Sequence, residues 1–575
     1  MKRVLSGGFL LAVAFLGPDA PAGDGWRTEW AVDGPFALEM DTTGFSSPTA
    51  IAFVPSPGPG PMDPLYFVVE LSGGIKVVTN DRTVIDFASV PTVLPEAELP
   101  DPSAQVGAAG ICLEENHGYV FVTFAGMREG GTLGNRVVRF TTKPEIFSAV
   151  SGPVVEIAPI LGTAQSAPSH QIGGCAIDGE KLYVGIGDGR DTAAASRRDD
   201  LLGKVVAMDL EGYALGTNPF ADDESEAAQY VYAMGFRNPF AVGVFEGLVT
   251  VIDNGLSIDR LVIAEPGVDY LWDGSDASIA ASATALIDPG AGAVHLDRSD
   301  PTSFLGDGIS YSASSPREGV GGFWFFPFDF TTGHTTGRPR QLVQYVGEGN
   351  SAVTAIASGP DGIYFTPLLP EGTHESSVLK LVYRPRDPHP IEIEPPTQDL
   401  FEQLECITCH ERDGTGGDVG PSLDFLNEEN RNRVLAMIHS EGFEELLRQL
   451  DDRTDEPFVS TRDARAEVLS ASGLARLRAY VKHKALEPRF ADPAATMPQL
   501  GLTEVEAAAV ASELATPWEI RLSAVEKTLR SWFPIPETRV GDIIVGAILG
   551  SFALAVLVTL LELARRFNPP RKGES

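Results

Sequence analysis

Two cysteines and a histidine in the last third of the chain have the types and spacing needed to hold a metal cofactor. Cys406 and Cys409 are separated by two residues, and His410 follows directly. In this C-x-x-C-H pattern two thiols form thioether bonds to a porphyrin and the adjacent imidazole ligates the iron. Zinc binding is the alternative, but no second pair of cysteines lies nearby to complete a zinc site. The motif therefore predicts one covalently bound haem c, which carries electrons.

A methionine further along the chain is the candidate sixth ligand, since a thioether on haem iron raises its redox potential. Met497 precedes a proline and then a helical segment. Together with the C-x-x-C-H motif, this arrangement over residues 399–516 resembles the class I cytochrome c family. The resemblance implies that the carbonyl of Pro421 accepts a hydrogen bond from Nδ1 of His410. The stretch between His410 and Met497 is longer than in compact members, and a core methionine is the alternative role for Met497.

The composition excludes one class of partner and indicates more than one domain. The chain has 575 residues, of which 43 are basic and 79 acidic, so its formal net charge is −36. Such an acidic surface repels the phosphate backbone of nucleic acids, which we exclude as partners. The length exceeds that of one ordinary hydrophobic core, so we expect two or three domains.

Both ends of the chain carry membrane signals. Residues 1–22 start with a basic pair, continue with an apolar run and end in Ala-Pro-Ala, as secretory signal peptides do. Residues 541–566 contain an uncharged stretch long enough, at about 1.5 Å per residue, to cross about 30 Å of hydrocarbon. Basic residues follow in 567–575, and the positive-inside tendency keeps that tail in the cytoplasm. We therefore expect an exported protein anchored in the cytoplasmic membrane, with its domains on the outer, periplasmic side.

A repeated pattern of short strands occupies the first two thirds of the chain. Six copies of a unit of β-rich runs separated by glycine turns start near Ile51, Gly110, Gly173, Phe240, Gly308 and Val353. Repeats of this period predict a β-propeller, because one blade cannot bury both its faces alone. We therefore predict an all-β six-bladed β-propeller over residues 27–386. An irregular β-sandwich is the alternative.

The pattern changes after the last repeat. Residues 387–398 are rich in proline and predict an extended linker. Beyond it, apolar residues recur three and four apart, which predicts a small all-α domain over 399–516. Residues 517–540 then connect this domain to the predicted membrane helix.

The order of motifs over residues 168–244 resembles that of a known enzyme family. PSHQIGGCAIDGEKLYVGIGDG, LLGKVVAMDLEG and YAMGFRNPFAVGV resemble the soluble PQQ-dependent glucose/sorbosone dehydrogenases, and the resemblance extends over about residues 40–385. It implies a six-bladed propeller that holds pyrroloquinoline quinone (PQQ) and Ca²⁺ at one end of its channel. It also implies oxidation of an aldose hydroxyl.

The resemblance assigns roles to individual residues. His170 falls on the general base, and Asp188 on the carboxylate that orients the histidine and stabilises its charged form. Quinone contacts fall on Gln105, Arg237 and Asn238, and calcium ligands, largely backbone carbonyls, on Asp253, Gly255 and Leu256.

Basic residues that the family uses are replaced in the last two repeats. Ala352-Val353-Thr354 stands where the family has Arg-x-Arg, and no basic residue occurs near Phe330 and Thr331. PQQ carries three carboxylates, which are costly to bury without cationic partners. Either another basic residue serves, or PQQ does not bind; the candidates are Arg338, Arg340 and Lys380.

Two functions therefore remain open. In the first, a quinoprotein dehydrogenase oxidises a sugar or alcohol and passes electrons through its haem to a respiratory acceptor such as another cytochrome or an oxidase. In the second, a non-catalytic propeller binds a ligand or a partner for a tethered cytochrome. A polar pocket around His170, Asp188 and Arg237 would favour the enzyme, and apolar filling the binding module.

Cys112 and Cys175 lie at equivalent positions in neighbouring repeats, outside the haem motif. Export permits a disulfide, but adjacent blades need not bring two Cα atoms within the usual limit of about 7 Å. A disulfide and two buried thiols therefore both remain open.

Overall fold

The computed structural model describes most of residues 24–515. The described ranges are 24–90, 106–127, 133–163, 168–299, 305–315, 319–348, 351–368, 376–393, 401, 404, 406–412, 415–417, 419–423 and 428–515. The predicted signal peptide, connector, membrane helix and cytoplasmic tail lie outside these ranges, as does Gln105. Among the helices within them, none is long and apolar enough to cross a membrane.

The chain divides into two compact units. The first consists of Met1–His410, Gly416–Gly420 and Ala485–Thr503, and the second of Glu411–Thr415, Pro421–Lys484 and Glu504–Ser575.

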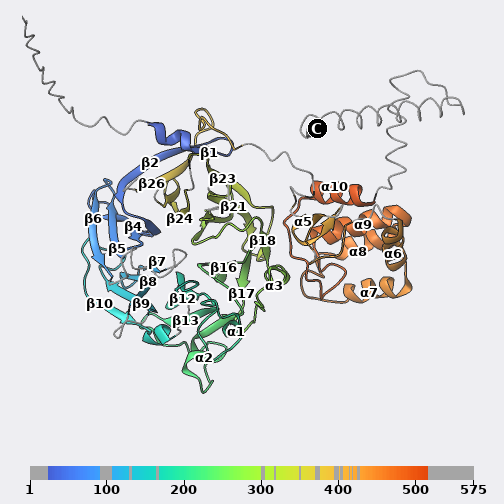
Figure 1. Ribbon diagram of the computed structural model, residues 1–575, viewed down its shortest axis with the longest axis horizontal. Coiled ribbons are helices and arrows are strands. Elements are labelled where there is room, and N and C mark those ends of the chain that lie inside the picture. Colours follow the sequence, from blue (N-terminus) through green and yellow to red (C-terminus); the bar gives the residue numbers. More distant parts are fainter. Residues whose placement is uncertain are drawn as a thin grey trace, which may run out of the picture. The chain divides into compact units, whose positions relative to one another are not determined.

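In the described part of the first unit, the strands form six antiparallel sheets arranged in a ring (Figure 1). Blade 1 contains β3 (Pro48–Phe53), β4 (Pro64–Glu70), β5 (Gly74–Thr79) and β6 (Val84–Ser89). Blade 2 contains β7 (Gly107–Glu114), β8 (Tyr119–Met127), β9 (Leu133–Thr141) and β10 (Val154–Ile157). Blade 3 contains β11 (Ile172–Asp178), β12 (Lys181–Ile186), β13 (Lys204–Asp209) and β14 (Val231–Met234).

The other three blades complete the ring. Blade 4 contains β15 (Ala241–Phe245), β16 (Leu248–Asn254), β17 (Asp259–Ala264) and β18 (Ala285–Ile287). Blade 5 contains β19 (Leu296–Ser299), β20 (Gly308–Ala313), β21 (Gly322–Asp329), β22 (His334–Thr335), β23 (Arg340–Tyr345) and β1 (Trp30–Val32). Blade 6 contains β24 (Val353–Gly359), β25 (Gly362–Pro367), β26 (Ser376–Tyr383) and β2 (Phe36–Phe45).

The first strands of successive blades lie side by side, and β24 of blade 6 lies beside β3 of blade 1, which closes the ring. The predicted six-bladed propeller is therefore confirmed, and the sandwich is excluded. Blade 5 begins one strand earlier than predicted, at β19. That strand is short and has the sequence Leu-Asp-Arg-Ser, which lacks the β-branched and aromatic residues that mark a strand.

The two outermost strands of blades 5 and 6 come from the start of the chain. β1 pairs with β23, and β2 pairs with β26 from Phe36 opposite Tyr383 to Phe45 opposite Ser376. The repeats alone do not predict this exchange, because β1 and β2 precede the first complete repeat. The pairing covers edges that would otherwise expose unpaired backbone groups.

A disulfide joins the first strands of blades 2 and 3. Cys112 and Cys175 are bonded, with their Cα atoms 6.0 Å apart. The close approach depends on glycine, because a Cβ on Gly110 would lie 2.8 Å from the Cα of Gly174. Of the two open alternatives for these cysteines, the structure has the disulfide.

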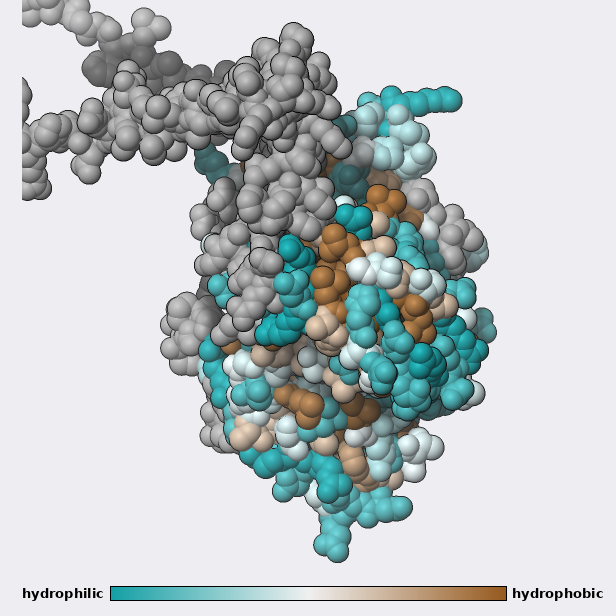
Figure 2. Space-filling model, turned by 90° about the vertical axis from the view of Figure 1, so that its right-hand side faces the viewer, coloured by the Kyte–Doolittle hydropathy of each residue, from teal (hydrophilic) through white to brown (hydrophobic). Residues whose placement is uncertain are grey.

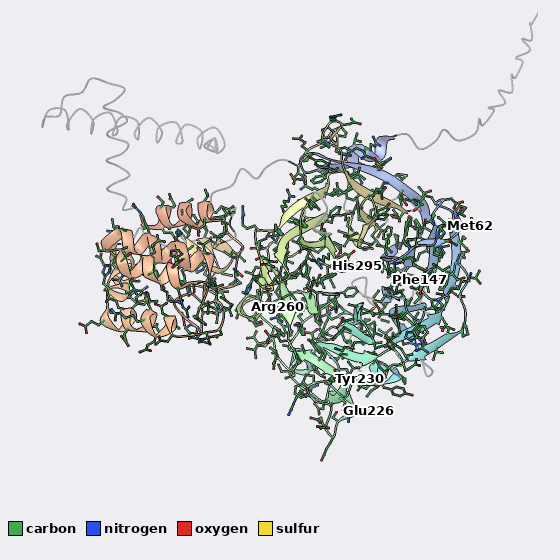
Figure 3. All side chains as sticks on the ribbon, turned by 180° about the vertical axis from the view of Figure 1, so that it is seen from behind. Met62, Phe147, Glu226, Tyr230, Arg260 and His295 are labelled. Carbon is green, nitrogen blue, oxygen red and sulfur yellow. A yellow bond between two sulfur atoms is a disulfide. The ribbon has the colours of Figure 1, made fainter. Side chains whose placement is uncertain are left out.

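Neighbouring blades pack through large apolar side chains in the wedges between them. Between blades 1 and 2, Phe67 packs edge to face with Phe147, and Phe87 with Phe140, at centroid distances of 6.0 and 5.6 Å (Figure 3). Burying each such side chain stabilises the fold by about 1.5–3 kcal/mol. On the face drawn in Figure 2, apolar residues lie among hydrophilic ones.

Short helices accompany the propeller, and longer ones follow it. The short ones are η1 (Asp24–Glu29), η3 (Pro159–Thr163), α1 (Thr192–Ala195), α2 (Glu226–Tyr230), α3 (Asp276–Ala281) and α5 (Cys406–Cys409). Two short strands follow α5, namely β27 (Glu411–Arg412) and β28 (Thr415–Gly416). The longer helices are α6 (Glu428–Ile438), α7 (Glu441–Asp451), α8 (Arg462–Ser470), α9 (Gly473–Leu486) and α10 (Glu504–Ala515). The predicted change to helical structure is confirmed.

A buried arginine connects two of the helices in the second unit. The side chain of Arg465 on α8 is fully buried and donates from Nε to Oδ1 of Asp451 on α7, at 2.6 Å. Ser440 caps α7 by accepting the backbone N–H of Phe443. That this helical region is a cytochrome c domain stays a prediction.

Candidate functional site

A buried histidine and aspartate meet at one edge of blade 3. His170 lies just before β11 and Asp188 just after β12, and these two strands are antiparallel. Their facing ends therefore bring the two side chains together, with Nδ1 of His170 2.6 Å from Oδ1 of Asp188. His170 is 5% and Asp188 2% exposed.

The backbone around this pair is strained and tightly packed. His170 and Arg190 have φ angles of +55° and +64°, in the left-handed region that non-glycine residues rarely adopt. A Cβ on Gly187 would lie 2.4 Å from the carbonyl oxygen of His170, so only glycine fits there. Strain of this kind is retained mainly where surrounding structure enforces it, often at functional sites.

The Asp188 carboxylate accepts hydrogen bonds at both oxygens. Oδ1 accepts from Nδ1 of His170 and from the backbone N–H of Arg190, at 2.6 and 2.8 Å, and Oδ2 accepts from Nε1 of Trp272 at 2.9 Å. Burial alone would raise the pKa of Asp188, but the hydrogen bond and charge of His170, with the Arg190 and Trp272 N–H groups, lower it. The ionised carboxylate can only accept, so it fixes the hydrogen of His170 on Nδ1.

Arg237 and Asn238 lie in the segment between β14 and β15, next to the pair. The carbonyl of Arg237 accepts the backbone N–H of Asp188 at 2.7 Å, and Nη1 of Arg237 donates to the carbonyl of Asn254 at 2.8 Å. Burial lowers the pKa of Arg237, while Asp188 and Asp253 nearby favour its charged form. The half-buried guanidinium thus places a cation beside the His170–Asp188 pair.

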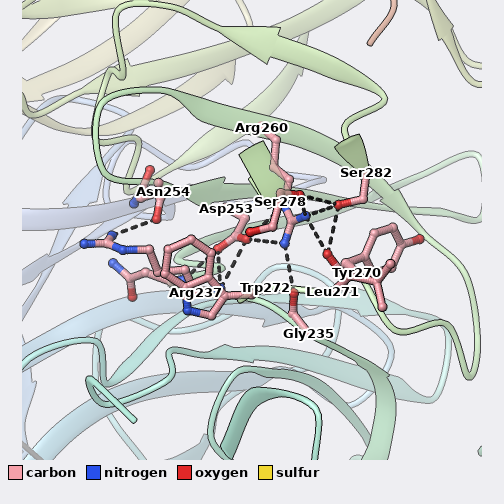
Figure 4. A network of polar contacts seen from close by, with 12 residues as sticks. Gly235, Arg237, Asp253, Asn254, Arg260, Tyr270, Leu271, Trp272, Ser278 and Ser282 are labelled. Atoms are coloured by element: carbon pink, nitrogen blue, oxygen red, sulfur yellow. Dashed lines mark hydrogen bonds and ion pairs between the residues drawn. The ribbon is translucent and has the colours of Figure 1, made fainter. Parts of the chain in front are cut away.

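A fully buried ion pair holds this segment in place (Figure 4). Oδ1 of Asp253 accepts the backbone N–H groups of Arg237 and Asn238 at 3.1 and 2.6 Å. Oδ2 accepts from Nε and Nη2 of Arg260 at 3.0 and 2.7 Å. Arg260 also donates to the carbonyls of Gly235 and Tyr270, at 2.9 and 2.8 Å.

The residues predicted to hold calcium lie at the end of β16 and in the loop that follows it. The Asp253 carboxylate is fully occupied by the network just described. The backbone N–H groups of Gly255 and Leu256 donate to the carboxylates of Asp259 and Asp276, at 3.0 and 2.9 Å. In the described ranges, no group of three or more His, Cys, Asp or Glu side chains is arranged to hold a metal ion.

Carbonyl and amide oxygens are therefore the ligands that this loop could offer to Ca²⁺, which prefers oxygen. The side-chain oxygen of Asn254 fits that role, since it is buried and accepts no hydrogen bond from the described residues. The calcium assignment stays a prediction.

The replaced basic positions of blades 5 and 6 are filled by packing. Val353 and Thr354 lie on β24, where Thr354 Oγ1 donates to the carbonyl of Pro48 at 2.6 Å, and Phe330 is buried. Of the candidate substitutes, Arg340 pairs with Asp33 and Lys380 with Asp361, on outer strands. Arg338 lies just before β23.

Arg190 is a second cation beside the His170–Asp188 pair, and it was not predicted from the sequence. It follows the GIGDG motif, its side chain is exposed, and its Nη2 lies 3.3 Å from Oγ of Ser169. Its place two residues after Asp188 is the signal that could have found it.

The buried Lys204 was also missed. Its ammonium donates to the carbonyls of Ala194, Ala195 and Leu202, at 2.9, 2.8 and 2.6 Å, and so holds the segment that follows Asp188.

The haem motif forms a short helical turn. The backbone N–H of His410 donates to the carbonyl of Cys406 at 3.0 Å, and Cys406 and Cys409 are both free thiols, unlike the other two cysteines. A Cβ on Gly420 would lie 2.4 Å from the His410 ring. Glycine at this position therefore lets the segment Gly420–Leu423 approach the histidine. Met497 lies half-buried between α9 and α10. These features fit haem attachment, and the ligand assignments stay predictions.

Solved structures of three sugar dehydrogenases are similar to this chain. The soluble aldose sugar dehydrogenase of Escherichia coli, in its apo form, is 15% identical with a TM-score of 0.48, over 61% of this chain and 100% of that one. The PQQ-bound aldose sugar dehydrogenase of Streptomyces coelicolor is 19% identical with a TM-score of 0.45, over 61% and 100%. A putative glucose dehydrogenase of Thermus thermophilus is 22% identical with a TM-score of 0.46, over 60% and 100%.

No curated protein matches the chain. Residues 45–296 match the family described as Glucose / Sorbosone dehydrogenase. This stretch contains the His170–Asp188 pair, Arg237 and the Asp253–Arg260 network. The part of the propeller that carries the candidate site is therefore the part that is similar to this sugar dehydrogenase family.

Proposed function

We propose that this protein is a membrane-tethered dehydrogenase. Its propeller oxidises a sugar or a related alcohol, and the electrons pass to a haem c bound at Cys406 and Cys409. The observation that carries the proposal is the buried His170–Asp188 pair beside the Arg237 cation, within the stretch that matches the family.

Two arginines suit the anionic cofactor of such an enzyme. Arg237 and Arg190 lie on segments hydrogen-bonded to Asp188, the first through its carbonyl and the second through its N–H. Their guanidinium groups would hold carboxylates of PQQ, and the Asn254 loop would offer oxygens to Ca²⁺. When bound, PQQ supplies the two-electron acceptor for the reaction.

The histidine handles the proton. Because Nδ1 of His170 donates to Asp188, the lone pair of this imidazole is on Nε2, which can take the proton of a substrate hydroxyl. Oxidation of the alcohol carbon removes one hydride, an electron pair with its proton, while the hydroxyl proton goes to Nε2. The ionised Asp188 then stabilises the imidazolium, as the carboxylate does in a catalytic triad.

A haem bound at Cys406 and Cys409 would supply a one-electron acceptor, because its iron changes by one electron. His410 and Met497 would ligate that iron, and fusion in one chain gives the electron acceptor a high effective concentration. A respiratory acceptor such as another cytochrome or an oxidase would receive the electrons. The tail helix over 541–566 would hold the protein at the outer side of the cytoplasmic membrane.

Cofactor retention tests the propeller half of the proposal. The full chain is mixed with PQQ and Ca²⁺, and bound PQQ is measured by absorbance after gel filtration. Arg237→Ala should weaken retention about 10- to 100-fold, because a charge-assisted bond is worth about 1.5–3 kcal/mol. Arg340→Ala is the matched control and should retain PQQ, since Arg340 pairs with Asp33 on an outer strand.

A denaturing wash tests the haem half. Thioether bonds survive acid acetone, whereas non-covalent haem is extracted, so the washed protein should keep its colour. Colourless protein from cells that mature c-type cytochromes contradicts the haem assignment. Met497→Ala should keep the haem but change its axial ligation and lower its potential.

The second candidate is a non-catalytic propeller that binds a ligand or partner for a tethered cytochrome. Ala352 and Thr354, in place of the family's two arginines, favour it. If wild-type protein binds no PQQ in the presence of Ca²⁺, and no sugar reduces the haem, this second candidate replaces the first.

A further inference from the structure

Trp272 reaches the candidate site from a different blade. It lies in the connection between β17 of blade 4 and α3, yet its Nε1 donates to Oδ2 of Asp188 in blade 3 at 2.9 Å. The side chain is 5% exposed. Neither the family resemblance nor the repeat pattern assigns it a role.

The backbone around Trp272 is fixed by the segment that carries Arg237. The N–H of Tyr270 donates to the carbonyl of Met234 at 2.8 Å, and that of Trp272 to Gly235 at 3.1 Å. Leu271 between them has a φ of +58°, in the left-handed region. The backbone that carries the indole is therefore fixed to blade 3, although its own chain segment follows blade 4.

The same indole contacts both parts of the site. Its N–H occupies Oδ2 of Asp188, while the guanidinium of Arg237 lies 5.9 Å from its ring centroid. Oδ1 of Asp188 is occupied by His170 and by the Arg190 N–H. With both oxygens bonded, the carboxylate cannot rotate away from the histidine without losing a hydrogen bond.

We infer that Trp272 is a positioning residue, which locks the Asp188 carboxylate toward His170 with its N–H and supports the anion-binding Arg237 with its ring. The catalytic part of this inference rests on the proposed function. The positioning of Asp188 by Trp272 does not rest on the proposed function, because it concerns contacts within the protein without cofactor.

The charged groups around Asp188 set the expected pH effect. His170, Arg190 and Arg237 surround the carboxylate, and Trp272 adds a neutral donor. The Trp272 bond is one of the contacts that lower the pKa of Asp188, so removing it raises that pKa. A hydrogen bond to a charged group corresponds to a shift of about one pH unit.

Trp272→Phe is the decisive variant, because it keeps an aromatic ring under Arg237 and removes the N–H. In cofactor-free protein, the NMR signal of the His170 Nδ1 proton should follow Asp188 protonation at a pH about one unit higher than in wild type. In PQQ-loaded protein, kcat should fall about tenfold with KM little changed. Trp324→Phe is the matched control, because Trp324 donates only to the carbonyl of Val320 in blade 5.

Other outcomes separate the two levels of the inference. If Trp272→Phe titrates like wild type, the positioning role is wrong. If the titration shifts but wild-type protein oxidises no sugar, the proposed function fails and the positioning role stands. Should Trp272→Phe not fold, wild-type protein still gives the test, since the Trp272 indole N–H signal must move as Asp188 titrates; a signal insensitive to acid overturns the inference.

Discussion

The buried Asp253–Arg260 ion pair of blade 4 contrasts with His295 and Asp297 of blade 5, which burial shifts toward their uncharged forms. Asp253 and Arg260 are both fully buried and paired in blade 4. In blade 5, burial lowers the pKa of His295 to about 4 and raises that of Asp297 to about 6 (Figure 3). The difference teaches that a buried group keeps its charge where an opposite charge lies within hydrogen-bond distance.

The largest expected effect concerns two histidines, His170 at the edge of blade 3 and His295 in blade 5. His170→Ala should slow sugar-dependent haem reduction 10²- to 10⁴-fold, about 3–5.5 kcal/mol of barrier, because a general base is lost. Haem content should not change. Stopped-flow reduction of the PQQ-loaded protein measures the rate, and His295→Ala, which removes contacts to the backbone of Ile356, should stay within a few-fold of wild type. Equal losses in both variants would break the comparison.

Loss of a buried ion pair should lower the free energy of unfolding more than loss of an exposed one. Arg260→Met leaves the Asp253 carboxylate buried without its cation, which costs about 3–5 kcal/mol of unfolding free energy. The matched variant in blade 5 is Arg298→Met, whose partners include the 62% exposed Glu246. An exposed pair contributes about 1 kcal/mol or less. Urea unfolding followed by tryptophan fluorescence compares the two, and a loss in Arg298→Met as large as in Arg260→Met contradicts the contrast.

The disulfide between blades 2 and 3 ranks next. Replacing Cys112 and Cys175 with serine should lower the free energy of unfolding by about 2–4 kcal/mol, because the unfolded chain regains loop entropy. The same urea unfolding measures this. Thiol counting under denaturing, non-reducing conditions should find neither cysteine free in wild type, and two free thiols from this pair would refute the bond.

The most specific effect is a pH dependence that differs between two buried groups, one in blade 3 and one in blade 5. Burial lowers the pKa of Lys204 in blade 3 to about 7, below its unfolded value of about 10.4, so this group removes stability as pH falls from about 10 to 7. His295 in blade 5, lowered to about 4 from about 6.5, removes stability as pH falls from about 6.5 to 4. Lys204→Met and His295→Asn should each abolish the dependence in its own window. Unfolding free energies measured across pH 4–10 check this, and a Lys204→Met curve parallel to wild type above pH 7 contradicts it.

The sequence predicts those features that local patterns determine. Six strand repeats give six blades, and the resemblance to the sugar dehydrogenases gives His170 and Asp188 as the candidate pair. Trp272 was not predicted as a site residue, because its partner Asp188 lies 84 positions away in the chain and nothing local marks the contact. Arg260 was not predicted as a site residue either. An arginine in an alternating strand normally faces solvent, and only the tertiary structure shows that this one is fully buried.

Other expectations depend on parts of the chain or on groups that the structure does not describe. Gln105, the signal peptide and the membrane helix lie outside the described residues. The predicted haem ligands His410 and Met497 are among the described residues, but their chemistry depends on a cofactor. These therefore stay predictions, whereas the propeller and the disulfide rest on described contacts.

The pairing of β2 with β26 determines when the propeller can close during synthesis of the chain. As the chain emerges N-terminus first, β2 is among the earliest strands made, but its partner is the last strand of the last blade. The ring cannot close until nearly the whole propeller has been synthesised, and such long-range pairing is intrinsically slow to form. During that interval β1 and β2 wait as unpaired edges, which invite association with other chains. The β2–β26 pairing that closes the finished ring therefore leaves strand edges of the nascent chain open to association with other chains until the last blade is complete.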